Sequence, residues 1–214
     1  MISIAISSVA GERRELCPEI CCEPASEPLG TQVQVGDRIG LTDHWAEIAK
    51  APRDELVTLE LWIRPDEAAI GRSRSFILIL SSANGADALG LSLFLKDGAV
   101  CGNVFGRFFE APEKLAADQW AHVALTVNSQ TVNKQAKLWV NGQIVAEDLI
   151  LNEWPKDFEV AEMLSDHWNQ GRAFSGKLGD VRISKVLRYD EKFSPANHLP
   201  KDENTVLLIE AGSF

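Results

Sequence analysis

Residues 119–143 carry the sequence pattern that most restricts how this chain can fold. Between residues 120 and 127 apolar side chains occupy every second position, so that one face holds Ala121, Val123, Leu125 and Val127. A period of two residues is typical of a β-strand with one buried face. A polar link leads to a second alternating stretch and then to Asn141-Gly142, two residues that tolerate the positive φ of a tight turn. The segment therefore predicts antiparallel strands joined by turns.

The same plan recurs earlier in the chain. Residues 57–63 alternate in the same way, and Pro65 ends that strand because proline has no N–H to donate to a neighbouring strand. Residues 76–80 are apolar on both faces, which predicts a central, covered strand. Residues 89–95 place four leucines on one face, and Asp97-Gly98 predicts a turn after them.

The last third of the chain continues the pattern. Strands are expected at residues 177–184 and 204–212, and a short helical turn around residues 189–196. Residues 45–50 suit either a strand or a helical turn. Many short strands without strand–helix–strand alternation predict an all-β fold, an antiparallel two-sheet jelly-roll sandwich.

Length and cysteine usage bound the domain organisation. With 214 residues, 45% of them hydrophobic, the chain can bury a large core, and we expect a single domain over residues 1–214. The exception to the strand pattern is an irregular loop at about 11–30, which contains Cys17, Cys21 and Cys22. Their spacing lacks the two pairs, or the nearby histidines, of a tetrahedral zinc site, so reduced or partly paired thiols are the favoured interpretation.

Charge and hydropathy exclude some partners. The net charge of −10 argues against nucleic acid and against an anionic membrane surface, whereas a neutral or cationic ligand or bound calcium is compatible with it. No apolar run approaches the roughly 18 residues that a membrane span needs. Residues 1–10 are apolar and end in Ser8-Val9-Ala10, but they lack the basic leader of a signal peptide, so we interpret them as a first strand.

Five segments resemble, in order, the signature strands of laminin-G-like, concanavalin A-like jelly-roll domains. They are residues 57–65, 119–128, 137–146, 174–189 and 205–212. The resemblance covers roughly residues 31–212 and implies two curved antiparallel sheets with a concave face and loops at one rim. It also implies roles in binding carbohydrate or protein, sometimes with calcium, and an extracellular or cell-surface location. A fold alone does not fix a function, so the site must be argued separately.

Catalytic motifs are not evident. Glycoside hydrolases on this kind of fold need two carboxylates about 5 to 5.5 Å apart, at alternate positions of one strand. Glu60 has no such partner on its strand, and nothing resembles the G-x-S-x-G motif of a serine nucleophile. We therefore expect a non-catalytic binding module for carbohydrate or another extracellular ligand. The alternative is a structural or protein-interaction domain, or an accessory part of a larger, even enzymatic, assembly.

Tryptophans supply the first candidate binding surface. Trp62, Trp120 and Trp139 fall on the face opposite the aliphatic one, together with Glu60 and His122. Flat indole rings beside hydrogen-bonding groups are what stacking against a sugar ring requires. The alternative is that loops cross the outside of the sheet and bury these rings, which is the commoner state of large aromatic side chains.

A loop near the C-terminal third supplies the second candidate. It combines aromatic, amide and charged groups, a mixture suited to ligand recognition on a rigid scaffold. Its candidate ligand-binding residues are Asp166, His167, Trp168, Asn169 and Arg172. The tripeptide Asp-His-Trp also occurs at residues 43–45, and coincidence explains so short a repeat equally well.

Asp180 is the candidate calcium ligand. Jelly rolls of the family that the chain resembles place an acidic side chain at this point, close to an early loop. Calcium needs six to eight oxygen ligands, and the sequence shows no complete set. The alternative is a carboxylate paired with Arg182 or Arg188.

Overall fold

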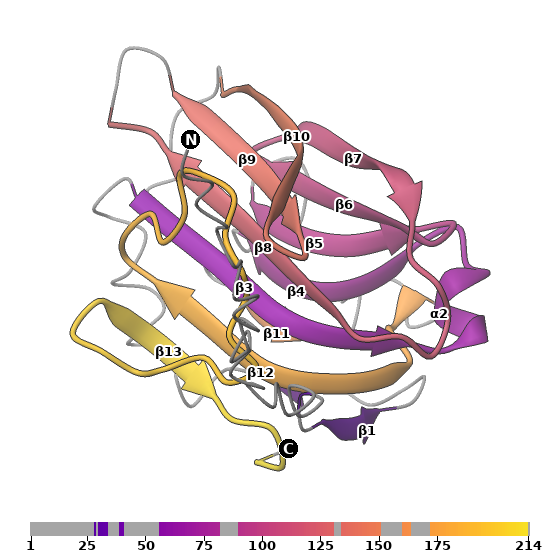
Figure 1. Ribbon diagram of the computed structural model, residues 1–214. Helices are drawn as coiled ribbons and strands as arrows, with labels where there is room; N and C mark the ends of the chain where they lie inside the picture. The colour runs from indigo at the N-terminus through magenta and orange to yellow at the C-terminus, as the bar shows by residue number, and fades with distance from the viewer. Residues whose placement is uncertain are drawn as a thin grey trace, which may run out of the picture.

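Two antiparallel β-sheets pack face to face in this computed structural model, which describes residues 28, 30–33, 39–40, 56–81, 90–130, 134–150, 160–163 and 172–213 (Figure 1). Sheet A contains, in spatial order, β1 (Thr31–Val33), β12 (Gly176–Ser184), β3 (Leu56–Pro65), β8 (Ala121–Asn128), β9 (Gln135–Val140) and β10 (Gln143–Leu149), with β13 (Thr205–Ile209) also paired to β12. Sheet B contains β2 (Ile39–Gly40), β11 (Val160–Met163), β4 (Ser75–Ser81), β5 (Leu91–Lys96), β6 (Ala99–Val104) and β7 (Arg107–Lys114). The predicted all-β, two-sheet jelly-roll sandwich is confirmed.

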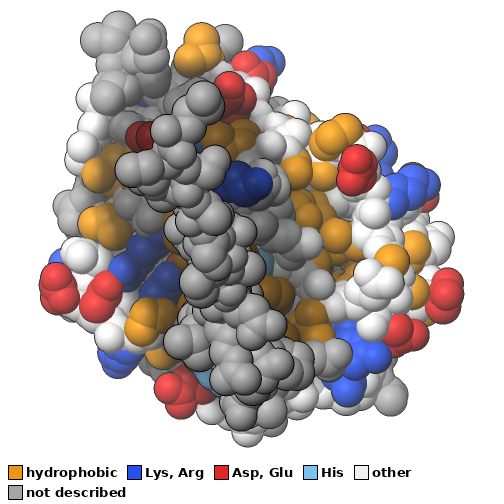
Figure 2. Space-filling model, in the orientation of Figure 1, with side chains coloured by type: hydrophobic (Ala, Val, Ile, Leu, Met, Phe, Trp, Pro, Cys, Tyr) orange, Lys and Arg blue, Asp and Glu red, His pale blue; other side chains and the backbone are white. Residues whose placement is uncertain are grey.

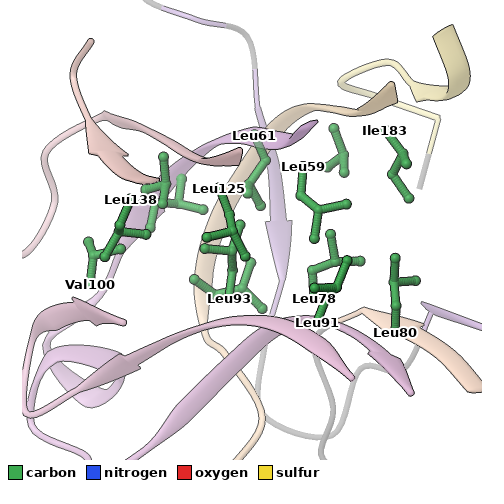
Figure 3. Close-up of a cluster of buried hydrophobic side chains, with 14 of the residues drawn as sticks. Leu59, Leu61, Leu78, Leu80, Leu91, Leu93, Val100, Leu125, Leu138 and Ile183 are labelled. Atoms are coloured by element: carbon green, nitrogen blue, oxygen red, sulfur yellow. The ribbon is translucent and has the colours of Figure 1, made fainter. Parts of the chain in front are cut away.

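The core lies between the two sheets, as the alternating pattern predicts. Leu59 and Leu61 on β3 are opposite Leu125 and Val123 on β8, and all four side chains are fully buried. Figure 3 shows such leucines of sheet A pointing toward Leu78, Leu91 and Leu93 of sheet B. Each buried aliphatic side chain contributes about 1.5 to 3 kcal/mol by leaving water, so this double layer is the main source of stability.

Tight turns set the register of the hairpins. At Asp97-Gly98, between β5 and β6, φ is 49° and 85°, and at Asn141-Gly142, between β9 and β10, it is 50° and 74°. Both turns are predicted from the sequence and confirmed. A third turn, Phe105-Gly106, has the same geometry but no Asn or Asp at its first position. The Asn103 side chain supports it by accepting a hydrogen bond from the Gly106 N–H at 3.0 Å.

Local details differ from the sequence predictions in two places. The helical turn expected around residues 189–196 is wrong, since this stretch is irregular, with bends at residues 190 and 191 and no helix. A helix that the sequence analysis missed, α2 (Glu67–Ile70), follows β3, and Asp66 caps it by accepting a hydrogen bond from the Ala69 N–H at 2.8 Å. In the described residues, no helix combines the length and apolar character that crossing a membrane requires.

Some predictions concern parts of the chain outside the described residues. They are the first strand at residues 1–10, the cysteine-containing loop at about 11–30 and the element at residues 45–50.

Candidate binding site

A long segment, residues 185–204, connects β12 to β13 by crossing the outer face of sheet A; we call it the crossing segment. It bonds to sheet residues along its whole path. Near its start, the Thr58 hydroxyl donates to the Val186 carbonyl at 2.7 Å and accepts from the Arg188 N–H at 3.0 Å. Farther along, the Trp62 indole N–H donates to the Ala196 carbonyl at 2.9 Å. Along this path the outer face of sheet A is therefore covered by another part of the same chain.

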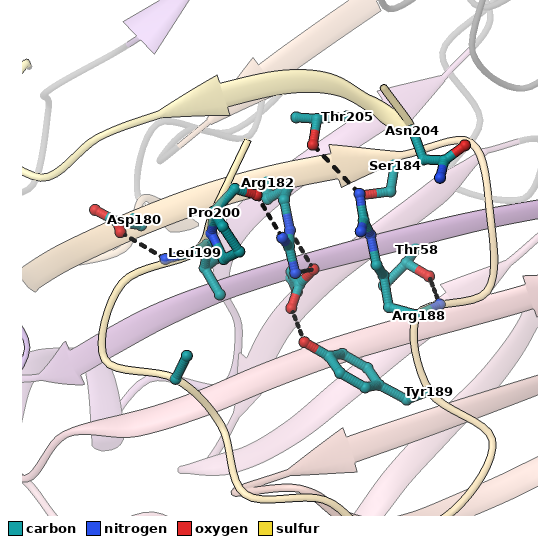
Figure 4. Close-up of polar contacts among 12 residues, drawn as sticks. Thr58, Asp180, Arg182, Ser184, Arg188, Tyr189, Leu199, Pro200, Asn204 and Thr205 are labelled. Atoms are coloured by element: carbon teal, nitrogen blue, oxygen red, sulfur yellow. Dashed lines mark hydrogen bonds and ion pairs between the residues drawn. The ribbon is translucent and has the colours of Figure 1, made fainter. Parts of the chain in front are cut away.

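Glu60 is the centre of a buried polar network beneath this segment. Figure 4 shows two of its partners, Arg182 and Tyr189. One carboxylate oxygen accepts from Arg182 Nε at 2.7 Å, and the other accepts from the Tyr189 hydroxyl and lies 3.3 Å from His122 Nε2. Burial alone raises the pKa of Glu60, but the His122 contact, the Arg182 charge and the Tyr189 hydrogen bond outweigh it and hold the pKa below its usual value. The carboxylate is thus charged at neutral pH and fastens the crossing segment to the sheet.

Burial corrects the first candidate binding surface. Trp62 is 8% exposed, and Glu60 and His122 are 0% exposed, so they cannot form the open aromatic platform that sugar stacking requires. Trp139 is also fully buried, and its indole N–H donates to the Thr126 hydroxyl at 2.9 Å. For Trp62 and Trp139 the alternative interpretation, that a segment crossing the sheet covers the rings, is the correct one.

The second candidate surface falls largely outside the described residues. Asp166, His167, Trp168 and Asn169 are not among them, and neither is the first Asp-His-Trp at residues 43–45. Arg172 is described and is half-buried. Ligand binding by this loop stays a prediction.

Asp180 is buried and accepts two backbone hydrogen bonds. Its oxygens accept from the Leu199 N–H at 2.9 Å and from the Ala211 N–H at 2.8 Å, while His198 Nδ1 lies 3.4 Å away (Figure 4). The expected alternative pairing with Arg182 or Arg188 is wrong, because those guanidinium groups bind Glu60 and Asp202. No group of three His, Cys, Asp or Glu side chains in the described part of the chain could hold a metal ion. Calcium binding at Asp180 stays a prediction.

A cavity of about 540 Å³ opens at the rim of the sandwich, where the edge strands β7 and β10 approach each other. We call it the rim cavity. Three segments line it: residues 111–116 at the end of β7, residues 119–121 before and at the start of β8, and residues 140–141 and 143–145 of the β9–β10 hairpin. Figure 2 shows hydrophobic side chains gathered right of centre, where β7, β10 and the start of β8 lie in Figure 1.

Trp120 is the aromatic residue of the rim cavity. Unlike Trp62 and Trp139 it is only half-buried, because it precedes β8 and lies beyond the sheet residues that the crossing segment covers. Gly30 fixes the position of its ring, since a Cβ atom there would lie 2.2 Å from the outer carbon Cη2 of the indole. The chain leading to Trp120 is tied to β3 by the Asp118 N–H, which donates to the Pro65 carbonyl at 2.8 Å.

Asn141 is the most firmly held polar residue of the cavity lining. Its backbone N–H donates to the His122 carbonyl, and its side-chain Oδ1 accepts from the His122 N–H at 2.9 Å. The adjacent Gly142 carbonyl accepts from the Phe193 N–H, so the crossing segment holds the turn from the other side. A side chain at Gly142 would clash, because a Cβ atom would lie 1.9 Å from the Phe193 carbonyl oxygen. The Asn141 amide is therefore oriented before any ligand arrives.

Other polar groups around the cavity are available to a ligand. The side chains of Glu113, Lys114, Gln119 and Gln143 line it and, within the described residues, make no hydrogen bond or ion pair. Nearby charges are already paired, since Arg107 binds Asp148 and Lys96 binds Glu110. A lining that combines a partly buried tryptophan with amides and one charge of each sign is suited to a small ligand rich in hydroxyl or carbonyl groups.

Sequence reasoning noticed Trp120 and the Asn141-Gly142 turn but did not combine them into a site. Alternation placed Trp120 with the other two tryptophans, and it gave no sign of where the crossing segment ends. The contribution of Glu113 and Lys114 carries no local signal, because β7 and the β9–β10 hairpin are about thirty residues apart in sequence and meet only through the packing of the two sheets.

Comparison with known proteins agrees with this architecture. A family model of the laminin G type, described as the concanavalin A-like lectin/glucanases superfamily, matches residues 42–191. The chain belongs to this superfamily. No protein with a curated description matches the sequence significantly.

Solved structures of this superfamily fold include proteins connected with glycans. One, from Bacteroides ovatus, is provisionally described as a carbohydrate-binding protein; it has a TM-score of 0.62 and 19% identity, over 88% of this chain and 53% of that one. This chain thus spans about half its length. Another is the CBM40 module of the Ruminococcus gnavus IT-sialidase bound to α2,3 sialyllactose, with a TM-score of 0.58 and 16% identity, over 76% of this chain and 92% of that one. A mutant of the Streptococcus pneumoniae NanB sialidase has a TM-score of 0.60 and 15% identity, over 77% of this chain and 27% of that one. At these identities the likeness establishes the fold.

Proposed function

We propose that this protein is a carbohydrate-binding module and that its ligand enters the rim cavity. The observation that carries the proposal is that the partly buried Trp120 and the fixed Asn141 amide line the same cavity of about 540 Å³. A cavity of roughly 300 to 1,000 Å³ with an apolar surface and a few fixed polar groups is the usual form of a small-molecule site.

Each part of the lining has a role in this proposal. The indole offers a flat surface to the C–H face of a sugar ring, and the amides of Asn141, Gln119 and Gln143 exchange hydrogen bonds with its hydroxyl groups. The carbohydrate-binding description and the sialyllactose complex among proteins of this fold support the same ligand class. An extracellular or cell-surface location, where glycans are exposed, is part of the proposal.

The test compares two aromatic truncations by isothermal titration calorimetry against a panel of neutral and acidic oligosaccharides. Trp120→Ala removes the cavity aromatic, whereas Phe108→Ala removes an aromatic side chain that is 55% exposed on β7 and does not line the cavity. A buried binding aromatic contributes about 1.4 kcal/mol or more, so Trp120→Ala should weaken binding about tenfold or more. Phe108→Ala should leave affinity unchanged.

Two results would oppose the proposal. If the folded parent protein binds no oligosaccharide, the carbohydrate-binding function is contradicted. If both variants lose affinity equally, the rim cavity is not the binding site. Thermal melts of each variant show whether a lost affinity reflects lost folding.

A protein-interaction function has its own supporting observation. The edge strand β10 exposes Ile144 and Leu149, at 41% and 48%, and an exposed strand edge can pair with another chain. A Leu149→Lys variant that abolishes association with a protein partner, while Trp120→Ala has no effect, would favour this alternative.

A further inference from the structure

We propose that Asn141 makes the rim cavity selective for a neutral, N-acetylated sugar, by donating a hydrogen bond from its side-chain Nδ2 to the acetamido carbonyl. This inference rests on the proposed carbohydrate-binding function and adds the class of ligand. It is argued from the orientation of one amide, the apolar wall beside it and the local charge.

The amide orientation follows from the hydrogen bonds of the β9–β10 turn. The Asn141 Oδ1 accepts the His122 N–H at 2.9 Å, which fixes the oxygen as the inward atom of the amide. The Nδ2 group then has no hydrogen-bond partner among the described residues, and Asn141 lines the cavity. Asn141 is exposed, so the site offers a preorganised donor, and a ligand that covers it without providing an acceptor would leave this donor unsatisfied.

Part of the cavity wall is aliphatic. Leu115, Ala116, Ile144 and Val145 line the cavity together with Trp120. An acetamido group has a carbonyl acceptor on one side and a methyl group on the other, so it can meet the amide and the aliphatic wall together. A simple hydroxyl at the same position of the sugar would satisfy the donor but would leave the apolar surface uncovered.

Charge favours a neutral sugar over an acidic one. Lys114 is the unpaired cation among the described residues that line the cavity, and Glu113 is adjacent to it. A ligand carboxylate would gain from Lys114 and be repelled by Glu113, in a protein whose net charge is −10. Planar, bidentate recognition of a carboxylate typically uses arginine, which is absent from the described lining.

The experiment measures binding to matched pairs of immobilised glycans that differ only in an acetamido group. The pairs are glucose with N-acetylglucosamine, galactose with N-acetylgalactosamine and mannose with N-acetylmannosamine oligosaccharides, with sialyllactose as the acidic probe. The parent protein should bind the N-acetylated member of at least one pair about tenfold or more tightly, because it gains a hydrogen bond and buries a methyl group.

Asn141→Asp is the decisive variant. Aspartate keeps an oxygen for the His122 N–H and replaces the Nδ2 donor with a second acceptor. The backbone should tolerate it, because Asp97 and Asp118 in this protein already adopt φ values of 49° and 58°. The variant should melt close to the parent and lose the preference for the N-acetylated glycan.

Asn128→Asp is the matched control, because it makes the same substitution at a side chain whose Oδ1 also accepts a backbone N–H, that of Gln130 at 3.0 Å, and Asn128 does not line the cavity. It should keep the N-acetyl preference. Equal affinity within every pair, tightest binding of sialyllactose, or loss of the preference in both variants would overturn the inference. In those cases weaker glycan binding by Trp120→Ala would still support carbohydrate binding in the rim cavity. If the parent binds no glycan, both this inference and the proposed function are contradicted.

Discussion

Glu60→Gln gives the most informative test of how the crossing segment is attached. Glutamine has the same shape but no charge, so Arg182, whose side chain is 5% exposed, would be left in the interior without its counter-charge. Arg182 and Tyr189 donate to different oxygens of Glu60, so the single amide oxygen of glutamine could accept from only one of them, and more weakly than a carboxylate. Breaking one partner of a buried ion pair typically costs about 3 to 5 kcal/mol, a large part of the roughly 5 to 15 kcal/mol that stabilises a domain.

The pH dependence of unfolding carries the second part of this prediction. Because the folded-state pKa of Glu60 lies below its usual value of 4.5, its charged form stabilises the fold above that pH. This contribution is lost as the pH falls through the lowered pKa, when the carboxylate becomes protonated in the folded protein as well. The difference between the parent and Glu60→Gln should therefore be full at pH 7 and shrink below about pH 4.5.

Urea unfolding at a series of pH values measures both effects. The Glu60→Gln, Arg182→Met double variant should recover part of the loss, because it removes the unpaired charge as well. Asp190→Asn is the control, since Asp190 pairs with Lys137 on the surface with 88% of its side chain exposed, and little change is expected. A Glu60→Gln protein within about 1 kcal/mol of the parent at pH 7, or a difference that does not vary with pH, would refute the reasoning.

Two further predictions concern the core and the metal. Leu61→Ala should lower the free energy of unfolding by about 2 to 5 kcal/mol, because Leu61 is fully buried between the sheets; a chemical denaturation curve unchanged from the parent would contradict this. If calcium binds at Asp180, millimolar calcium should raise the melting temperature of the parent but not of Asp180→Asn. Absence of a calcium-dependent rise in the parent would contradict the metal prediction.

The inward face of each strand could be predicted from the sequence because burial imposes a period of two residues. The odd-numbered side chains at positions 57–63 and 121–127 all belong to the core between the sheets, as that pattern requires. Turns were predictable where Asp or Asn precedes glycine, but the Phe105-Gly106 turn was not, because its support comes from Asn103.

The outer face was not predictable in the same way. Thr58 looks like a solvent-facing residue in an alternating strand, yet it is fully buried and bonded to Val186 and Arg188. Alternation tells which residues share a face, but it gives no sign that a distant segment will cover that face. The same gap explains why Trp62 and Trp120 looked equivalent in sequence and differ in exposure.

The most direct test of binding in the rim cavity is a nuclear magnetic resonance titration that follows the indole N–H signals of the six tryptophans. The signals are assigned with single Trp→Phe variants, and an oligosaccharide that the protein binds is then added stepwise. The rim-cavity site predicts that the Trp120 signal shifts with ligand concentration. Trp62 and Trp139, whose N–H groups donate to Ala196 and Thr126 inside the protein, should stay unchanged. An unmoved Trp120 signal together with a shifted Trp168 signal would contradict the rim cavity and place the ligand at the loop of residues 166–172.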